Sequence, residues 1–336
     1  MRILVTGGAG FIGSEYVRML LGAPGSTDPT DPQVEPTAVT VLDKLTYSGN
    51  PQNLAPARDD RRLRFVPGDI CDAALVDEVV ADQDVIVHFA AESHVDRSIA
   101  GAAPFVVTNV LGTQTLLDAA LRHGTQRFVH VSTDEVYGSI EEGSWTESWP
   151  LSPNSPYSAS KAGSDLLALA YHRTHGMDLV VTRCSNNYGP YQFPEKVIPL
   201  FVTNLLDGGT VPLYGDGGNI RDWLHVHDHC VGIALVQEKG RAGEVYHIGG
   251  GTELTNRELT ARLLAACGAG WDRVVPVADR KGHDRRYSLD ISKIAEELGY
   301  APSIDLERGL AQTVQWYREN RAWWEPLKAG AAPVGA

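Results

Sequence analysis

The sequence predicts an α/β fold built on a doubly wound parallel sheet, followed by a smaller C-terminal lobe. The chain opens on a short apolar strand that runs into a glycine-rich turn and then into an apolar helix. Apolar runs recur along the first half of the chain, and helical patterns separate them. Because these runs are continuous rather than alternating, they indicate parallel strands covered by helices on both faces.

The elements can be placed by their apolar spacing. Strands are expected at residues 2–6, 39–42, 64–67, 85–90, 127–131 and 179–182, and long helices at 105–122 and 156–174. Residues 22–37 are rich in Pro, Asp, Gly and Thr, which predicts a solvent-exposed loop without a catalytic role. Beyond about residue 190 turns become frequent and the elements shorten, with helices expected near 254–266 and 305–320.

The bulk composition excludes several classes of protein. With 43% hydrophobic and 21% charged residues, the 336-residue chain has the make-up of a globular protein. Its formal net charge of −13 argues against a nucleic-acid partner and requires local cations wherever a phosphorylated ligand binds. The first residues enter a strand directly, and no apolar run reaches membrane-spanning length, so a cytoplasmic location is expected.

Cysteine and histidine spacing gives little support to a metal site. The four cysteines are widely separated, which predicts inert thiols in a reducing compartment. Three histidines alternate in HVHDH at 225–229, a run that a zinc ion could use together with His94. No matching set of carboxylates or cysteines accompanies them, so we predict no metal.

The glycine-rich turn predicts a dinucleotide site. Gly7, Gly10 and Gly13 permit a tight turn, a close approach of the backbone to a pyrophosphate, and close packing of helix on strand. Asp43, at the end of the second strand, is placed to accept hydrogen bonds from the adenosine ribose and to repel a 2′-phosphate, which favours NAD over NADP. The neighbouring Lys44 would weaken this exclusion of NADP. A Rossmann-type domain is therefore expected.

Two further patterns carry candidate chemistry. Tyr157 and Lys161 are one helical turn apart, so an ammonium would lie near a phenol and favour the phenolate, a base for a sugar hydroxyl. Asp134 and Glu135 follow a predicted buried strand, where open parallel sheets bind their ligands. Adjacent acids often belong to a solvated loop, but two carboxyls in different surroundings can serve as acid and base.

These motifs together resemble a known family. GGAGFIG, Asp43, Tyr157-x-x-x-Lys161 and STDEVYG look like the extended short-chain dehydrogenases/reductases. Within that family, HFAAESHVDRS, STDEVYG, SPYSASKAGSD and RCSNNYGPYQFPEK closely resemble the dTDP-glucose 4,6-dehydratases over nearly the whole chain. The 22–37 loop is longer than the connection typical of the family.

The resemblance implies a hydro-lyase that uses NAD without consuming it. Tyr157, assisted by Lys161 and Thr133, would deprotonate the sugar 4-hydroxyl as hydride leaves C4. Glu135 would then remove the C5 proton while Asp134 protonates the departing 6-hydroxyl. The hydride would return to C6, and a proton would return to C5. The product would be a 4-keto-6-deoxy sugar nucleotide for deoxysugar biosynthesis. The resemblance also implies a homodimer formed through the helices at 105–122 and 156–174.

Carried over position by position, the resemblance assigns further contacts. Cofactor contacts are implied at Gly7, Gly10, Phe11, Ile12, Gly13, Asp43, Lys44, Leu45, Thr46, Asp69, Ile70, Ala90, Ala91, Ser93, Thr108, Tyr157, Lys161 and Asn187. Nucleotide-sugar contacts are implied at Ser93, Thr133, Asn186, Glu195, Lys196, Val197, Pro212, Leu213, Tyr214, Arg221, Asn256, Arg280, His283 and Tyr287. The expected division is an NAD-binding domain (1–190, with some later segments returning to it), a nucleotide-sugar-binding lobe (191–327) and a flexible tail (328–336).

Two other functions compete with this one. A nucleotide-sugar 4-epimerase or decarboxylase of the same family would share the glycine turn and the Tyr-Lys pair but would not need the Asp134-Glu135 pair. A non-enzymatic NAD-binding protein would have no need of Tyr157 or Lys161, and both are present.

Overall fold

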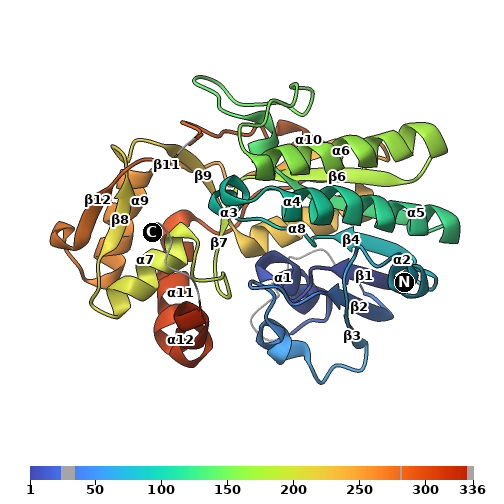
Figure 1. The fold of residues 1–336 in the computed structure, drawn as a ribbon, viewed down its shortest axis with the longest axis horizontal. Helices are drawn as coiled ribbons and strands as arrows, with labels where there is room; N and C mark the ends of the chain where they lie inside the picture. The colour runs from blue at the N-terminus through green and yellow to red at the C-terminus, as the bar shows by residue number, and fades with distance from the viewer. Residues whose placement is uncertain (24–34, 281, 331–336) are drawn as a thin grey trace.

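A seven-stranded, wholly parallel sheet forms the centre of the molecule in a computed structural model that describes residues 1–23, 35–280 and 282–330 (Figure 1). The strand order is β10-β6-β5-β4-β1-β2-β3. Their bounds are β1 Arg2–Thr6, β2 Ala38–Asp43, β3 Leu63–Pro67, β4 Val85–His88, β5 Arg127–Thr133, β6 Leu179–Cys184 and β10 Val245–Ile248. The predicted fold class and all six predicted strands are confirmed. Most of the predicted 22–37 loop and of the 328–336 tail lies outside the described residues.

Helices cover both faces of this sheet, and alternate strand residues enter two separate cores. Ile3 and Val5 of β1 pack on the side of α1 and α8, whereas Leu4 packs on the side of α2, α5 and α6. The helix bounds are α1 Phe11–Leu20, α2 Ala73–Val80, α5 Thr113–His123, α6 Pro156–His175, α8 Val226–Lys239 and α10 Ser292–Leu298. This two-sided burial explains the continuous apolar runs.

The predicted helix at 105–122 differs from a regular α-helix. It consists of α4 (Ala103–Phe105), a π-helical stretch η2 (Val106–Gly112) and α5. Within η2, the Asn109 side chain bonds the main chain of Glu92 on both its N–H and its carbonyl, and Gly112 packs so closely that a Cβ would lie 2.5 Å from Ile70. Wide π turns are frequent at functional sites, and Thr108 on this turn lines the cavity described below.

The remaining chain builds a smaller lobe from short elements. One sheet has the order β11-β9-β7 and another pairs β12 with β8. The lobe comprises β7 Asn186–Tyr188, α7 Val197–Leu206, β8 Val211–Tyr214, β9 Ile220–His225, β11 Glu253–Thr255, α9 Asn256–Cys267, η4 Trp271–Arg273, β12 Val274–Val277, α11 Leu306–Glu319 and α12 Arg321–Gly330. Its core is separate from the two cores of the main sheet. Although both follow residue 190, β10 is a strand of the main sheet and α8 packs against one face of it.

Strand order places the ligand site. Between β4 and β1 the order reverses, and open α/β sheets bind ligands at the carboxyl ends of the strands beside such a point. Three short elements lie near those ends: η1 Pro51–Ala57, α3 Val95–Ala100 and η3 Asp134–Tyr137. Among the described residues, no helix is both long and apolar enough to cross a membrane.

Candidate active site

A cavity of about 300 Å³ opens beside the glycine turn between β1 and α1. Gly7 has φ +70°, and a Cβ on it would lie 2.6 Å from the Ala90 nitrogen. A Cβ on Gly13 would lie 2.4 Å from the Gly7 carbonyl oxygen, so both positions exclude side chains. Gly10 meets only that carbonyl, at 3.2 Å, and lines the cavity, so a side chain there would fill space left open for a ligand. This cradle fits a dinucleotide pyrophosphate.

Asp43 is fixed at the end of β2 by the backbone around it. Its Oδ2 accepts a hydrogen bond from the Ala9 N–H at 2.9 Å, and its Oδ1 accepts one from the Leu45 N–H at 2.8 Å. Burial raises the pKa of this carboxyl, and the two N–H donors oppose that rise. The carboxylate is therefore held in place where it lines the cavity, the position that the ribose-binding prediction requires.

Lys44, which was expected to soften the exclusion of NADP, forms an ion pair with a carboxylate. Its ammonium lies 2.6 Å from Asp69 Oδ2, and Asp69 Oδ1 in turn accepts a hydrogen bond from the Cys71 N–H at 3.0 Å. The ammonium lowers the pKa of Asp69, so the pair is ionised. This ion pair would compete with any contact between Lys44 and a 2′-phosphate.

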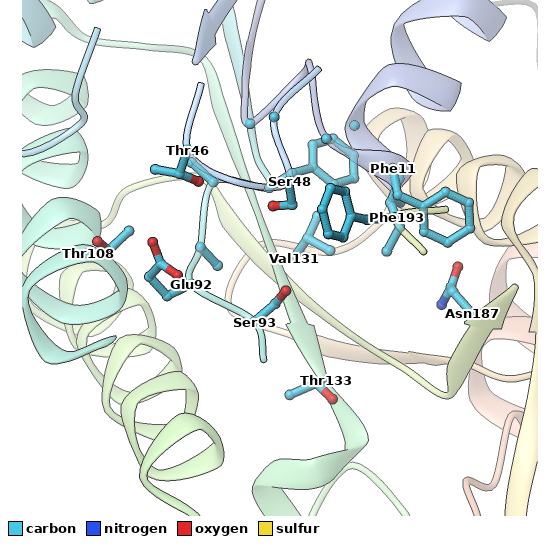
Figure 2. Close-up of a pocket in the computed structure, with 18 of the residues that line it drawn as sticks. Phe11, Thr46, Ser48, Glu92, Ser93, Thr108, Val131, Thr133, Asn187 and Phe193 are labelled. Atoms are coloured by element: carbon cyan, nitrogen blue, oxygen red, sulfur yellow. The ribbon is translucent and has the colours of Figure 1, made fainter. Parts of the chain in front are cut away.

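Nearly all of the predicted cofactor residues line this cavity. The exception is Leu45, which has φ +55° and contributes its N–H to Asp43 instead. Figure 2 shows Phe11, Thr46, Ser93 and Thr108 around the opening, with Thr133 where its strand ends. Lining residues that the sequence analysis missed include Ser48, Gly49, Glu92, Val131, Ser132, Cys184, Ser185, Gln192 and Phe193. Some directly follow or end a strand, a signal that was available, but Gln192 and Phe193 come from a loop of the smaller lobe.

The Tyr157 and Lys161 side chains enter the same cavity from the first turns of α6. A reciprocal capping box between Ser155 and Ser158 fixes where this helix begins. Lys161 Nζ donates to the Val131 carbonyl at 2.8 Å, and burial raises the pKa of Tyr157 well above its usual value. Lys161 was expected to lower the pKa of the Tyr157 phenol, but desolvation raises that pKa, and the Lys161 ammonium is held by β5.

Thr133, Asp134 and Glu135 form the turn that leaves β5. The Thr133 hydroxyl donates to Asp134 Oδ1 at 3.2 Å and accepts from the Glu135 N–H at 3.2 Å, so one residue orients both acids. The hydroxyl also lies beside the Tyr157 phenol, where it moderates the rise in its pKa. All four side chains border one cavity, so the predicted constellation is assembled.

The two acids differ in their surroundings. Asp134 is 2% exposed, and burial, together with the charge of Glu135, raises the pKa of Asp134 well above its usual value. Burial also raises the pKa of Glu135, but the cations Lys196, Arg280 and Arg221 oppose that rise. Asp134 is therefore the group that favours the protonated form, and Glu135 the one with support for its charge.

A second cavity of about 190 Å³ continues from the first into the smaller lobe. Glu135, Asn186, Asn187, Gln192, Glu195 and Lys196 line both. The second is also bordered by the predicted residues Val197, Pro212, Leu213, Tyr214, Arg221, Asn256, Arg280 and His283. Tyr287 borders neither cavity: its hydroxyl donates to Asp284 at 2.6 Å, and its ring lies under the Arg221 guanidinium at 4.0 Å. Trp223 and Thr260 are lining residues that the sequence analysis missed.

Three cations concentrate positive charge in this second cavity. Lys196 donates to the Ser93 carbonyl at 3.1 Å, and Arg221 donates to the Asp284 carbonyl at 2.9 Å. Within the described part of the chain neither has a carboxylate within 4.0 Å, whereas Arg280 lies 3.6 Å from Asp96. Backbone carbonyls thus orient Lys196 and Arg221 without neutralising them, which leaves their charge for an anionic ligand.

The HVHDH histidines have structural partners. His225 caps α8, its Nδ1 accepting from the His227 N–H at 3.2 Å, and His229 Nδ1 lies 2.9 Å from the Asn187 side-chain oxygen. Among the described residues no group of three or more His, Cys, Asp or Glu side chains is arranged to hold a metal. Through His229, α8 orients Asn187, a predicted cofactor contact.

Comparisons with known proteins agree with this geometry. The profile of the family described as GDP-mannose 4,6 dehydratase matches residues 4–313. A dTDP-glucose 4,6-dehydratase of Streptomyces antibioticus is 68% identical over 337 aligned residues, covering 100% of this chain and 98% of that protein.

Solved structures give the same result. The DesIV dTDP-glucose 4,6-dehydratase of Streptomyces venezuelae, crystallised with NAD bound, is 68% identical with a TM-score of 0.94 over 97% of this chain and 100% of that one. A UDP-glucose 4-epimerase of Thermotoga maritima is 32% identical, with a TM-score of 0.86 over 96% of this chain and 100% of that one. This chain therefore belongs to the nucleotide-sugar 4,6-dehydratase family of extended short-chain dehydrogenases/reductases, in the group of the dTDP-glucose 4,6-dehydratases.

Proposed function

We propose that this chain dehydrates dTDP-glucose to dTDP-4-keto-6-deoxyglucose, with the acid–base roles carried by Thr133, Asp134, Glu135, Tyr157 and Lys161. The observation that supports it best is that the Tyr157 phenol and the Asp134-Glu135 pair border one cavity together with the glycine cradle. An elimination of water that is driven by oxidation at a neighbouring carbon needs both sets of groups within reach of one sugar.

The first step needs a base at the 4-hydroxyl. Bound NAD would accept a hydride from C4 and return it at C6, so no external oxidant is needed. In its phenolate form Tyr157 takes the hydroxyl proton, and the Thr133 hydroxyl beside it supports that phenolate. Because Lys161 is tied to β5 through the Val131 carbonyl, its fixed ammonium adds a positive field when the phenol ionises.

In the second step one acid serves as the base and the other as the proton donor. The 4-ketone acidifies the C5 proton, which Glu135 removes as a carboxylate that Lys196, Arg221 and Arg280 help to keep charged. Asp134, buried and held protonated by its raised pKa, donates its proton to the departing 6-hydroxyl. Because these two residues are adjacent on one turn, a single sugar can meet both.

The second cavity is the proposed site of the nucleotide. Lys196, Arg221 and Arg280 offer charge to the diphosphate, which a chain of net charge −13 must supply locally. Tyr214, whose ring lies 6.4 Å from that of His283, offers an aromatic face to the base or ribose. Tyr287 would act indirectly, because its ring packs against the Arg221 guanidinium and positions it.

Product analysis tests this function. Purified protein incubated with dTDP-glucose should give a 4-keto-6-deoxy product, identified by NMR, with no net accumulation of NADH. A panel of dTDP- and UDP-hexoses would show the preferred base and sugar. A product epimerised at C4 that retains its 6-hydroxyl would refute the proposal in favour of an epimerase.

We also propose a cytoplasmic homodimer that takes a nucleotide sugar and no nucleic acid. Apolar side chains remain exposed along the predicted interface helices: Val106, Val107 and Leu111 are 52, 47 and 49% exposed, and Leu166 on α6 is 56% exposed. A second copy of the chain would bury this stripe by twofold pairing. Light scattering should give twice the chain mass of 36.4 kDa, and the mass of a single chain would contradict the dimer.

A further inference from the structure

The main chain at Ala9, in the middle of the glycine turn, is held from both ends. Its N–H donates to Asp43 Oδ2, and its carbonyl accepts from the Asn50 N–H and from Asn53 Nδ2, both at 2.9 Å. A turn that is held in this way pays less conformational entropy when a pyrophosphate binds.

Asn53 occupies a buried position that uses every polar group it has. It is 1% exposed, its side-chain amide donates to Ala9, and its main-chain carbonyl accepts from the Arg18 guanidinium of α1. Its remaining acceptor, Oδ1, accepts a hydrogen bond from the indole N–H of Trp323 at 3.0 Å. Asn53 thus joins the turn to a residue 270 positions later in the chain.

Trp323 belongs to α12 and is itself fixed by an aromatic cluster. Its ring lies 5.0 Å from Trp316 of α11 and 5.7 Å from Tyr191, and Tyr191 lies under the Arg18 guanidinium at 4.3 Å. In Figure 1, α12 follows α11 at the end of the smaller lobe, while the chain passes from β2 to β3 on the main sheet. The indole N–H is therefore presented to Asn53 from a rigid support.

We propose that Trp323 and Asn53 are positioning residues for NAD, acting in series through the Ala9 carbonyl. The Trp323 N–H fixes the orientation of the Asn53 amide, because an indole N–H can only donate and so requires the amide oxygen to face it. The amide NH₂ is then directed at Ala9, and the glycine turn is held in the form that receives the pyrophosphate. Helix α12 thereby contributes to cofactor affinity without touching the cavity.

The inference rests on the proposed NAD-dependent function and is tested by binding rather than by turnover. The full-length chain, freed of bound nucleotide, is titrated calorimetrically with NAD and separately with dTDP. Trp323→Phe, which keeps an aromatic ring but removes the donor, should weaken NAD binding about threefold to tenfold, the range of one neutral hydrogen bond. Asn53→Ala should weaken it at least as much, while dTDP binding stays unchanged in both.

A neighbouring tryptophan supplies a matched control. Trp324 is fully buried, and its indole N–H donates to the Tyr317 carbonyl at 2.7 Å rather than to Asn53. Trp324→Phe should lower Tm at least as much as Trp323→Phe does, yet leave the NAD dissociation constant within about twofold, because it removes a hydrogen bond of the same kind. A loss of NAD affinity that follows Tm across the variants would reduce Trp323 to a structural role and overturn the proposal.

A double-mutant cycle tests whether the two residues act in series. Trp323→Phe in the Asn53→Ala background should cost no further NAD affinity, since its route to the turn is already cut. Additive losses, or NAD binding equal to that of the wild type in both single variants, would overturn the proposal. If the wild-type chain itself binds dTDP but no NAD, the proposed function fails, which is a distinct result.

Discussion

The two connected cavities are built in different ways. The first lies at the carboxyl ends of the parallel strands, and its reactive groups sit on regular elements: Tyr157 and Lys161 on the first turns of α6, and Thr133 to Glu135 where β5 ends. The second is assembled from short strands and from loops that are far apart in the sequence, with Lys196, Arg221 and Arg280 coming from separate segments.

Their electrostatics differ in the same sense. The first cavity holds acids and a phenol whose pKa values are raised by burial, so these groups favour their protonated forms. The second holds three cations, and two of them, Lys196 and Arg221, bond to backbone carbonyls rather than to carboxylates. The contrast suggests separate regions for proton transfer and anion binding, which adjoin where Glu135 and Lys196 line both cavities.

The largest expected effect comes from removing the phenol. Tyr157→Phe keeps the buried ring but has no group to take the 4-hydroxyl proton, so kcat should fall about a hundredfold to ten thousandfold. Steady-state product formation measures this, and NAD and dTDP binding serve as controls that should be unchanged. If turnover persists at the wild-type rate, the base lies elsewhere.

Blocking only the second half-reaction should separate oxidation from elimination. In the double variant Asp134→Asn, Glu135→Gln, oxidation at C4 remains possible but proton transfers at C5 and the 6-hydroxyl are lost. Single-turnover absorbance should show NADH that forms and persists, while product formation falls at least about a hundredfold. Full dehydratase turnover in this variant would remove both acids from the mechanism.

Neutralising the second cavity should weaken binding more than chemistry. Arg221→Gln and Arg280→Gln each remove a charged donor, so we expect KM for dTDP-glucose to rise about tenfold to a hundredfold with a smaller change in kcat. The wild-type KM should also rise with added salt, and less steeply in the variants. A variant that loses kcat at unchanged KM would place that arginine in the chemistry instead.

Asp134 should also leave a signature in stability against pH. Its folded pKa is raised, so the folded state holds its proton more tightly than the unfolded chain, and stability falls as pH rises from about 4, the ordinary Asp value, through the raised one. Asp134→Asn removes this pH-dependent loss of stability, because an amide does not titrate. Thermal unfolding from pH 5 to 9 should show a Tm advantage for the variant that grows with pH. A constant or shrinking advantage would mean that Asp134 is ionised in the folded protein.

The smallest effect is expected at the rim of the first cavity. The Lys44 side chain is 57% exposed and paired with Asp69, and such a surface pair contributes about 1 kcal/mol or less. Lys44→Ala should therefore change NAD affinity less than about fivefold and should not admit NADP. Asp43→Ser, which removes the ribose acceptor, is the comparison and should narrow the preference for NAD over NADP. NADP binding by Lys44→Ala would show that Lys44, not Asp43, sets the choice.

Local spacing predicted the first cavity well because its parts are local. A strand, a glycine turn and a helix form one continuous segment, and Tyr157 and Lys161 are one turn apart on α6, so their side chains share a face wherever the helix lies. Leu45, which only the family resemblance assigned to the cofactor, does not line the cavity, and its backbone N–H holds Asp43 instead. The partner of Lys161 was also missed, since β5 and α6 meet only in the fold.

What the sequence determined by itself is the parallel α/β architecture, the dinucleotide turn, and which residues could exchange protons with a ligand. All of these depend on periodicity and on short spacings along the chain. Tertiary structure alone decided that Gln192 and Phe193 reach the cofactor cavity, that Tyr287 supports Arg221 from outside, and that Trp323 bonds Asn53. The pKa directions of Asp134 and Tyr157 were likewise decided by burial, because desolvation depends on neighbours that the chain brings together only on folding.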